Sequence, residues 1–210
     1  MAHRITGSHL ARAADSDQRG VPGDEAALVQ AARRGDREAF GTLVSRHARS
    51  IISVTTRMLG PGADAEDVAQ DTFVAAFKAL PGFRLDSKFS TWLYRIAINK
   101  CTDSLRARRP EVQSLDDDGR DDDSRAPIEP ATEETPDWEL ERVELAWELD
   151  KAIEALPRLY RESFVLRHIE DLGYDEMSAI LGVHRDTLKM RVYKARMLLC
   201  RSLAHLGGVR

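Results

Sequence analysis

Apolar residues recur at three- and four-residue steps through the N-terminal half of the chain, which is the spacing of helices that bury one face. Over residues 25–59 this pattern is interrupted at Gly35-Asp36, which predicts a short helix followed by a longer one. The run Gly60-Pro61-Gly62 ends the second helix, a third runs to Pro81-Gly82, and a fourth is expected over residues 89–108. The expected buried stripe of the third helix consists of Val68, Thr72, Phe73, Ala76, Phe77 and Leu80.

Helical spacing also marks the C-terminal part of the chain. One helix is expected over residues 138–156, stopped by Pro157, and a second over 158–168. The stretch 173–199 divides at Gly182-Val183 into a helix of about eight residues and a longer one, which is typical of a helix-turn-helix. No segment alternates in the manner of a strand, so the sequence predicts an all-α fold. The expected contacts across the turn join Met177, Ile180 and Leu181 to Leu188, Val192 and Ala195.

Charge divides the chain into parts. The whole protein has a formal net charge of −4, yet residues 110–137 hold eleven acidic residues and two arginines, a net of −9. Such a segment buries too little apolar surface to offset the entropy lost on ordering, so a flexible, disordered linker is predicted. The sequence therefore predicts a disordered tail over 1–24, a helical domain over 25–109, the acidic linker over 110–137 and a second small helical domain over 138–206. Outside the linker the chain is basic overall.

Two basic segments favour contact with nucleic acid. The last long helix sets Arg185, Lys189, Arg191, Lys194, Arg196 and Arg201 against Asp186 alone, and a basic helix after a glycine turn suits a DNA major groove; a solvated basic face is the alternative. Residues 83–109 hold seven basic and two acidic residues with aromatic residues between them. Lysine and arginine side chains can contact the phosphates of a nucleic-acid strand. Aromatic rings can stack on its unpaired nucleobases, and Asn99 can form hydrogen bonds with them. We expect at least two of Trp92, Leu93 and Ile96 in the core, and Phe83 and Phe89 free to bind.

The third helix has the opposite charge. Asp64, Glu66, Asp67 and Asp71 lie within eight residues, with Asp64 as the expected N-cap. Acidic residues are stabilised at a helix N-terminus by the macrodipole, which is one explanation of the cluster. A surface that docks on a basic protein is the other, and these residues alone leave both open.

Several classes of protein are poorly supported by the sequence. No apolar run approaches the roughly 18 residues of a membrane span and residues 1–24 lack a signal-peptide core, so a cytoplasmic protein without membrane insertion is expected. Cys101 and Cys200 have no metal-ligand spacing and are expected to be buried and unrelated, rather than a redox switch. HExxH, GxxxxGK[ST] and GxGxxG are absent and the six histidines form no ligand set, so no metal, cofactor or catalytic residue is expected. His47 is expected in the core.

Three segments, taken together, resemble the extracytoplasmic-function (ECF) sigma factors. They read DAEDVAQDTFVAAFKAL from residue 64, FRLDSKFSTWLYRIAINKCTDSLRARR from residue 83, and LPRLYRESFVLRHIEDLGYDEMSAILGVHRDTLKMRVYKARMLL from residue 156. The resemblance covers about residues 24–203. It implies two helical domains, sigma-2 and sigma-4, joined by a linker that threads the channels of RNA polymerase. The implied function is transcription initiation without catalysis, by binding core RNA polymerase and promoter DNA and melting the −10 region.

The resemblance also implies roles for individual residues. Docking on the β′ clamp helices of core RNA polymerase would involve Asp64, Glu66, Asp67, Gln70 and Asp71. The −10 element would be bound by Phe83, Arg84, Ser87, Lys88, Phe89, Asn99, Lys100, Asp103, Arg106, Arg108 and Arg109, with a flipped base held by the 83–89 loop and Asn99. The −35 element would face Arg185, Thr187, Lys189, Met190, Arg191, Tyr193, Lys194 and Arg196, of which the three arginines would serve phosphates or salt bridges. Sigma-4 would also bind the β flap, and an anti-sigma factor is the regulator expected in this family.

Two residues depart from the family's pattern in the last helix. His184 is a poor N-cap, so the turn before it is expected either to differ slightly or to be supported by other residues. Met190 stands where a serine is common, so it would contact a thymine methyl group or nothing.

Two other classes of protein are the alternatives to a sigma factor. A stand-alone helix-turn-helix regulator would leave the acidic helix without a purpose. An enzyme acting on nucleic acid would need a catalytic motif, and the sequence contains none of those considered above.

Overall fold

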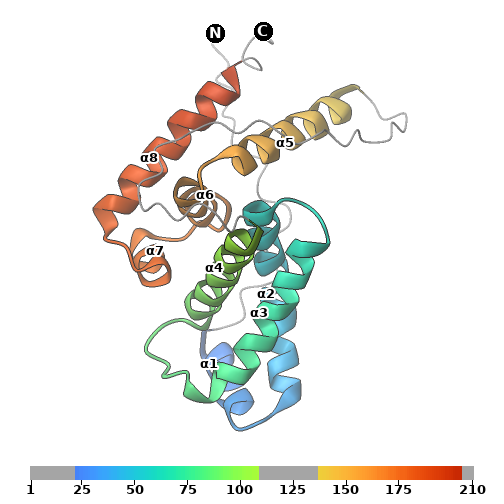
Figure 1. The fold of residues 1–210 in the computed structure, drawn as a ribbon. Coiled ribbons are helices and arrows are strands. Elements are labelled where there is room, and N and C mark those ends of the chain that lie inside the picture. Colours follow the sequence, from blue (N-terminus) through green and yellow to red (C-terminus); the bar gives the residue numbers. More distant parts are fainter. Residues whose placement is uncertain (1–21, 109–136, 205–210) are drawn as a thin grey trace, which may run out of the picture.

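The computed structural model describes residues 22–108 and 137–204, and every regular element in these two ranges is helical. The first range holds α1 (Pro22–Arg33), α2 (Arg37–Leu59), α3 (Ala63–Ala79), η1 (Leu80–Gly82) and α4 (Phe89–Arg108). The second holds α5 (Asp137–Ala155), α6 (Arg158–Phe164), η2 (Val165–Ile169), α7 (Tyr174–Leu181) and α8 (Arg185–Ser202). The all-α fold in two helical regions, the second with a helix-turn-helix, is confirmed (Figure 1). Arg109, most of the predicted tail and nearly all of the acidic linker lie outside the described residues.

The first helical region is built around α2. Its apolar residues Leu43, Ile51, Val54 and Met58 follow the helical repeat and are at most 1% exposed, so they form one continuous buried face. Helices α1, α3 and α4 all pack against α2, and Leu93 is the largest of the fully buried residues of α4. Burying a side chain of this size contributes about 1.5–3 kcal/mol, so these five positions specify how the helices meet.

Local signals fix both ends of α2. The Asp36 carboxylate accepts hydrogen bonds from the backbone N–H groups of Glu38 at 2.9 Å and Ala39 at 3.0 Å, which makes it the N-cap. At the other end Gly60 has φ 86°, and a Cβ there would lie 2.7 Å from Oε1 of Glu154 in the second helical region. Both helix breaks predicted from the sequence, at Gly35-Asp36 and at Gly60, are therefore confirmed.

Helix α3 is rotated relative to the expected stripe. Its buried residues are small ones, Ala65, Ala69, Thr72 and Ala76, whereas Phe77 is 39% exposed and touches the ring of Phe40 at 5.0 Å. The prediction that Phe77 belongs to the buried stripe is wrong, because small side chains let α3 approach the neighbouring helices closely.

The start of α3 also differs from the sequence expectation. Gly62 is the residue before the helix, and Asp64 lies within the first turn. The expectation of Asp64 as N-cap is therefore wrong by two positions, but its carboxylate still lies at the positive end of the helix dipole.

The helix-turn-helix forms as the sequence predicts. Gly182 adopts the left-handed conformation, with φ 66°, and its N–H donates to the carbonyl of Ser178 at 2.9 Å. His184 is the N-cap of α8, and its Nδ1 accepts from the backbone N–H of Asp186 at 3.4 Å, a long hydrogen bond that agrees with the expectation of a poor cap. The buried face across the turn consists of Met177, Ile180, Leu188, Val192, Ala195 and Leu199, while Leu181 is partly buried. The expected helix over 158–168 is α6 continued by the π-helical turn η2.

The two helical regions lie against each other. Helix α7 contacts α4, and α5 and α6 contact α2 (Figure 1). Within residues 22–108 and 137–204, no helix combines the length and the apolar character that crossing a membrane needs.

Candidate functional site

Phe83 and Phe89 close the base of the loop that joins η1 to α4. Each is 4% exposed, and both rings stack around Trp92, with centroids 4.9 Å and 5.7 Å from its ring. The prediction that these two rings are free to bind a base is wrong for this structure, because aromatic rings gain more from mutual burial than from exposure. Leu93 is in the core, and Trp92 and Ile96 are partly buried against it, as expected.

The residues between the two rings form an exposed loop. Arg84, Ser87 and Lys88 are all exposed, so the loop offers polar groups held between two buried anchors. Leu85 has φ 60°, a left-handed backbone conformation that leucine rarely adopts, and its side chain is 39% exposed. Lys88 is engaged, since its Nζ donates to Glu176 of α7 at 2.7 Å.

An exposed polar stripe runs along α4. Asn99 and Asp103 are exposed one turn apart, and Arg106 follows with its guanidinium 3.8 Å from the Asp103 carboxylate. Arg95 lies four residues before Asn99 and is also exposed, so it belongs to the same stripe. Sequence reasoning missed Arg95, although its spacing from Asn99 was a sufficient signal.

The acidic start of α3 and the basic end of α4 neutralise each other in part. Lys100 lies 3.2 Å from the Asp71 carboxylate, and Arg108 pairs with Asp64. Two residues expected on DNA therefore contact two residues expected on the polymerase. Glu66, Asp67 and Gln70 are exposed, and the two acids form no ion pair with another residue in the described part of the chain.

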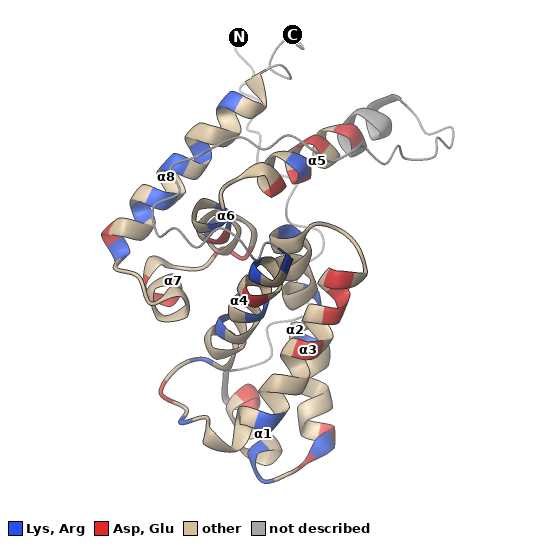
Figure 2. Ribbon diagram, in the orientation of Figure 1, with Lys and Arg blue, Asp and Glu red and all other residues tan. Residues whose placement is uncertain are grey.

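Helix α8 presents a basic face with two apolar side chains at its centre. Met190 is 55% exposed and Tyr193 is 59% exposed, and Lys189 and Lys194 are exposed on the same helix. Lys and Arg residues recur along the length of α8 (Figure 2). Met197, 42% exposed, extends the apolar centre by one more turn and was not expected from the sequence. The exposed residues of the predicted −35 set are Arg185, Thr187, Lys189, Met190, Tyr193, Lys194 and Arg196.

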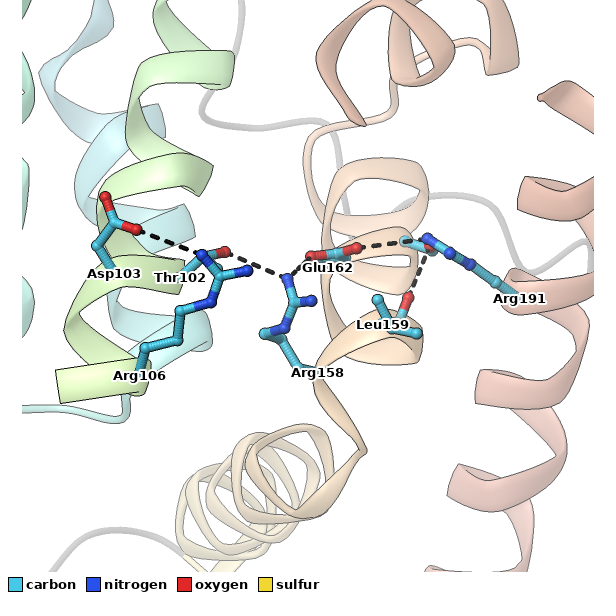
Figure 3. Close-up of polar contacts among 8 residues, drawn as sticks. Thr102, Asp103, Arg106, Arg158, Leu159, Glu162 and Arg191 are labelled. Atoms are coloured by element: carbon cyan, nitrogen blue, oxygen red, sulfur yellow. Dashed lines mark hydrogen bonds and ion pairs between the residues drawn. The ribbon is translucent and has the colours of Figure 1, made fainter. Parts of the chain in front are cut away.

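Arg191 points away from this face. Its side chain is 18% exposed and lies 3.5 Å from Glu162 of α6, whose side chain is 4% exposed and also accepts from Arg158 at 3.1 Å (Figure 3). Burial raises the pKa of the Glu162 carboxyl, and the two guanidinium groups oppose that rise. Of the two roles expected for Arg191, phosphate contact and salt bridge, the structure favours the salt bridge.

The remaining candidates for chemistry are isolated. Cys101 is buried and Cys200 is exposed, so the expectation of two buried cysteines is wrong for Cys200. His47 is partly buried, with its ring 5.4 Å from Phe89 and its Nε2 3.4 Å from Glu25. No group of three or more His, Cys, Asp or Glu side chains within residues 22–108 and 137–204 is arranged to hold a metal ion.

Comparison with protein families assigns both helical regions. Residues 43–111 match the family described as Sigma-70 region 2, and residues 146–199 match Sigma-70, region 4. These matches contain the α3–α4 segment and the helix-turn-helix, respectively.

Curated relatives cover most of the chain. The RNA polymerase sigma-H factor of Pseudomonas aeruginosa is 33% identical over 184 residues, 85% of this chain and 93% of its own length. The ECF RNA polymerase sigma-E factor of Escherichia coli is 34% identical over 172 residues, 80% of this chain and 88% of its own length.

Solved structures show the same architecture. CnrH, in complex with the cytosolic domain of CnrY, is 30% identical with a TM-score of 0.65, over 87% of this chain and 98% of CnrH. RpoE of Bartonella quintana, in complex with the anti-sigma factor NepR, is 27% identical with a TM-score of 0.60, over 81% of this chain and 98% of RpoE.

An all-α chain that couples a region 2 to a helix-turn-helix region 4 is an RNA polymerase sigma factor, which gives transcription initiation its promoter specificity. The relatives place it more narrowly: the chain belongs to the ECF sigma factors of the sigma-70 family.

Proposed function

We propose that this protein initiates transcription without catalysing a reaction, with its two helical domains dividing the promoter between them. The observation that carries the proposal is the presence, in one chain, of a region 2 and a region 4 that each expose a basic helix surface, on α4 and on α8. The proposed domain limits are those predicted from charge, 25–109 for sigma-2 and 138–206 for sigma-4, with the tail before them and the acidic linker between.

Sigma-2 is proposed to dock on the β′ clamp helices of core RNA polymerase through α3. Glu66, Asp67 and Gln70 are exposed on this helix and are the residues most available to a basic partner. Asp64 and Asp71 form ion pairs with Arg108 and Lys100 of α4, respectively. These two acidic residues can therefore also hold the DNA-binding helix α4 in place relative to the docking surface on α3.

The −10 element is proposed to bind along the 84–88 loop and the exposed stripe of α4. Arg84, Ser87 and Lys88 would contact the backbone and a flipped base, while Arg95 and Asn99 continue the path along α4. Phe83 and Phe89 keep a role as buried anchors that fix the ends of the loop. Opening is then driven by the binding energy of the separated strand.

The −35 element is proposed to face α8, with its apolar centre against the groove. Lys189 and Lys194 can reach phosphates or base edges, and Met190 and Tyr193 can contact thymine methyl groups. Sigma-4 would also bind the β flap.

An anti-sigma factor is proposed as the regulator, because the two similar solved structures, CnrH with CnrY and RpoE with NepR, are described as complexes, the second with an anti-sigma factor.

The docking assignment is tested by reversing one charge. Asp67→Arg should weaken binding to core RNA polymerase by at least tenfold, because it sets like charges opposite each other. Glu38→Arg, an exposed carboxylate of α2 changed in the same way, is the matched control. Equal affinities for core polymerase in the two variants would reject the assignment of α3.

The −10 assignment is tested by Asn99→Ala, which should impair formation of the open complex more than formation of the closed duplex complex. An equal loss in both complexes would reject a role of Asn99 in holding an unpaired base.

A further inference from the structure

Asp186 is the one acidic residue of α8, and it lies on the face of this helix that is proposed to enter the major groove. It precedes Met190 by four residues and Tyr193 by seven, a spacing that places side chains on one face of a helix. Met197 continues the same line by one more turn, and all four side chains are exposed. The carboxylate therefore begins the central line of the proposed DNA-binding face and does not lie at the edge of that face.

Capping of α8 does not account for this carboxylate. The side chain that caps the helix is His184, whose Nδ1 accepts from the backbone N–H of Asp186. The carboxylate itself accepts elsewhere, since its Oδ1 receives a hydrogen bond from the Nζ of Lys189 at 2.9 Å. The helix dipole favours an acidic residue in the first turn, which is one explanation of Asp186. Recognition of a base is the other, and it offsets the repulsion between the carboxylate and the DNA phosphates.

The hydrogen-bonding capacity of Asp186 restricts which base it can recognise. The hydrogen bond from Lys189 and the positive charge of its ammonium group lower the pKa of the Asp186 carboxyl below its ordinary value of 3.8. An ionised carboxylate accepts hydrogen bonds and donates none. In the major groove the donors are the N4 amino group of cytosine and the N6 amino group of adenine, whereas guanine and thymine present acceptors. Adenine also presents N7, an acceptor, beside its amino group, so cytosine is the base that suits an aspartate.

Lys189 extends this match from one base to a whole base pair. Its ammonium group has three hydrogens, so it can donate to Asp186 and to a base at the same time. The guanine paired with a cytosine presents O6 and N7 as acceptors in the major groove. Within the pair, N4 of cytosine donates to O6 of guanine, so these two atoms are about 2.9 Å apart. The Oδ1 of Asp186 and the Nζ of Lys189 are also 2.9 Å apart, and they present the complementary acceptor and donor.

We propose that Asp186 determines specificity at the −35 element by accepting a hydrogen bond from N4 of a cytosine, while Lys189 donates to the guanine of the same pair. This base pair lies against the first turn of α8, where recognition helices place the residues that contact base edges. A guanine or a thymine in place of the cytosine sets an acceptor against the carboxylate, so Asp186 also acts against the wrong sequences. The inference rests on the proposed function of α8 as the helix that faces the −35 element.

The test compares base preferences at the −35 element. Holoenzyme assembled from core RNA polymerase and the full-length protein is allowed to select among duplex promoter fragments in which the −35 region is randomised. Sequencing the bound fraction gives the relative affinity for each base at each position. We expect the wild-type holoenzyme to prefer a C·G pair at one position by at least about fivefold, the lower end of the discrimination that a good base contact provides.

Two substitutions of Asp186 separate base recognition from a general effect of charge. Asp186→Ala removes the acceptor, so the preference for C·G at that position should fall below about twofold while the other positions keep theirs. Asp186→Asn adds a donor to the acceptor, and an amide suits N6 and N7 of adenine, so the discrimination between cytosine and adenine should shrink.

Asp171→Asn is the matched control, because it removes the same charge from an exposed aspartate that lies outside α8. Asp171 forms a similar ion pair, with Arg167 at 3.2 Å, and its φ of 50° is one that asparagine tolerates. Its base profile should equal that of the wild type.

The outcomes separate the inference from its alternatives. Loss of the cytosine preference in Asp186→Ala, with the control unchanged, supports the inference. A base profile that stays the same in Asp186→Ala, even with a higher affinity for every fragment, overturns it and assigns Asp186 to the helix dipole alone. A wild-type −35 motif without a preferred C·G pair overturns it as well. Failure of the proposed function of α8 would show differently, as a selected pool with no shared −35 motif, and the inference would fall with it.

Discussion

Arg191 and Arg196 lie on the same helix, α8, but we expect Arg191 to stabilise the fold and Arg196 to contact DNA. The substitution Arg191→Met tests this structural role of Arg191. Removing one partner of a buried ion pair costs roughly 3–5 kcal/mol. Glu162 keeps Arg158 at 3.1 Å after the change, so we expect about half of that loss, roughly 2 kcal/mol of unfolding free energy. In a chain of this size the loss corresponds to a fall in Tm of about 4–8 °C.

The pH dependence of the same variant gives a sharper signature. Burial raises the folded-state pKa of Glu162 above its ordinary value of 4.5. The protonated carboxyl therefore favours folding at pH values below 4.5. This contribution to stability is lost as the pH rises from 4.5 through the folded-state pKa. Arg191→Met removes one of the two cations that hold this pKa down, so the loss on raising the pH grows. The deficit in unfolding free energy of Arg191→Met, relative to the wild type, should be full near pH ~7. It should shrink below the unfolded-state pKa of Glu162, where the carboxyl is protonated in both the folded and the unfolded state.

Urea denaturation at several pH values measures this deficit, and Arg196→Met is the control. Arg196 is exposed, so its loss should change stability by less than about 0.5 kcal/mol. Arg196 is proposed to contact one phosphate. Arg196→Met should therefore reduce the magnitude of the slope of log affinity against log salt concentration, measured for promoter binding by the holoenzyme, by about 0.9. The reverse result, an unchanged stability and a changed salt slope for Arg191→Met, would refute the assignment of Arg191 to the interior.

Three further predictions concern individual side chains. Asp36→Ala should cost about 1 kcal/mol in urea denaturation, because two backbone N–H groups of α2 lose their acceptor; a loss below about 0.3 would contradict the cap. Cys200 should react with a thiol reagent in the native protein while Cys101, whose burial raises its pKa to about 12, should not, as mass spectrometry would show; equal labelling would contradict this. The His47 ring, whose Nε2 lies 3.4 Å from the carboxylate, lowers the pKa of Glu25, so the contribution of Glu25 to stability is present above 4.5 and is lost as the pH falls through the folded-state pKa. Glu25→Gln should remove that part of the acid-induced fall in Tm, and an identical Tm–pH curve would argue against it.

Helix boundaries could be predicted because their causes are local. The break at Gly35-Asp36, the turn at Gly182-Val183 and the start of α4 at Phe89 each depend on residues within one helical turn, and all three are found where the sequence places them. The division into two helical regions followed from the acidic composition of residues 110–137 in the same way.

The direction in which side chains face could not be predicted as well, because it depends on distant residues. Phe77 and Ala76 are adjacent on α3, and only the close approach of the neighbouring helices selects the smaller one for the core. Arg191 and Arg196 look alike in the sequence, and the buried Glu162 that separates their roles lies on another helix. The sequence around Phe83 is compatible both with stacking on a nucleobase and with burial in the core. The contact between the rings of Phe83 and Trp92 in the structure favours burial.

The central claim, that this chain directs RNA polymerase to promoters, is tested most directly by transcription with purified core RNA polymerase on fragments of the protein's own genome. We expect new transcripts only when the protein is added, all starting downstream of one shared pair of −10 and −35 motifs. The absence of new transcripts, together with tight duplex binding by the free protein, would contradict the account and indicate a stand-alone helix-turn-helix regulator.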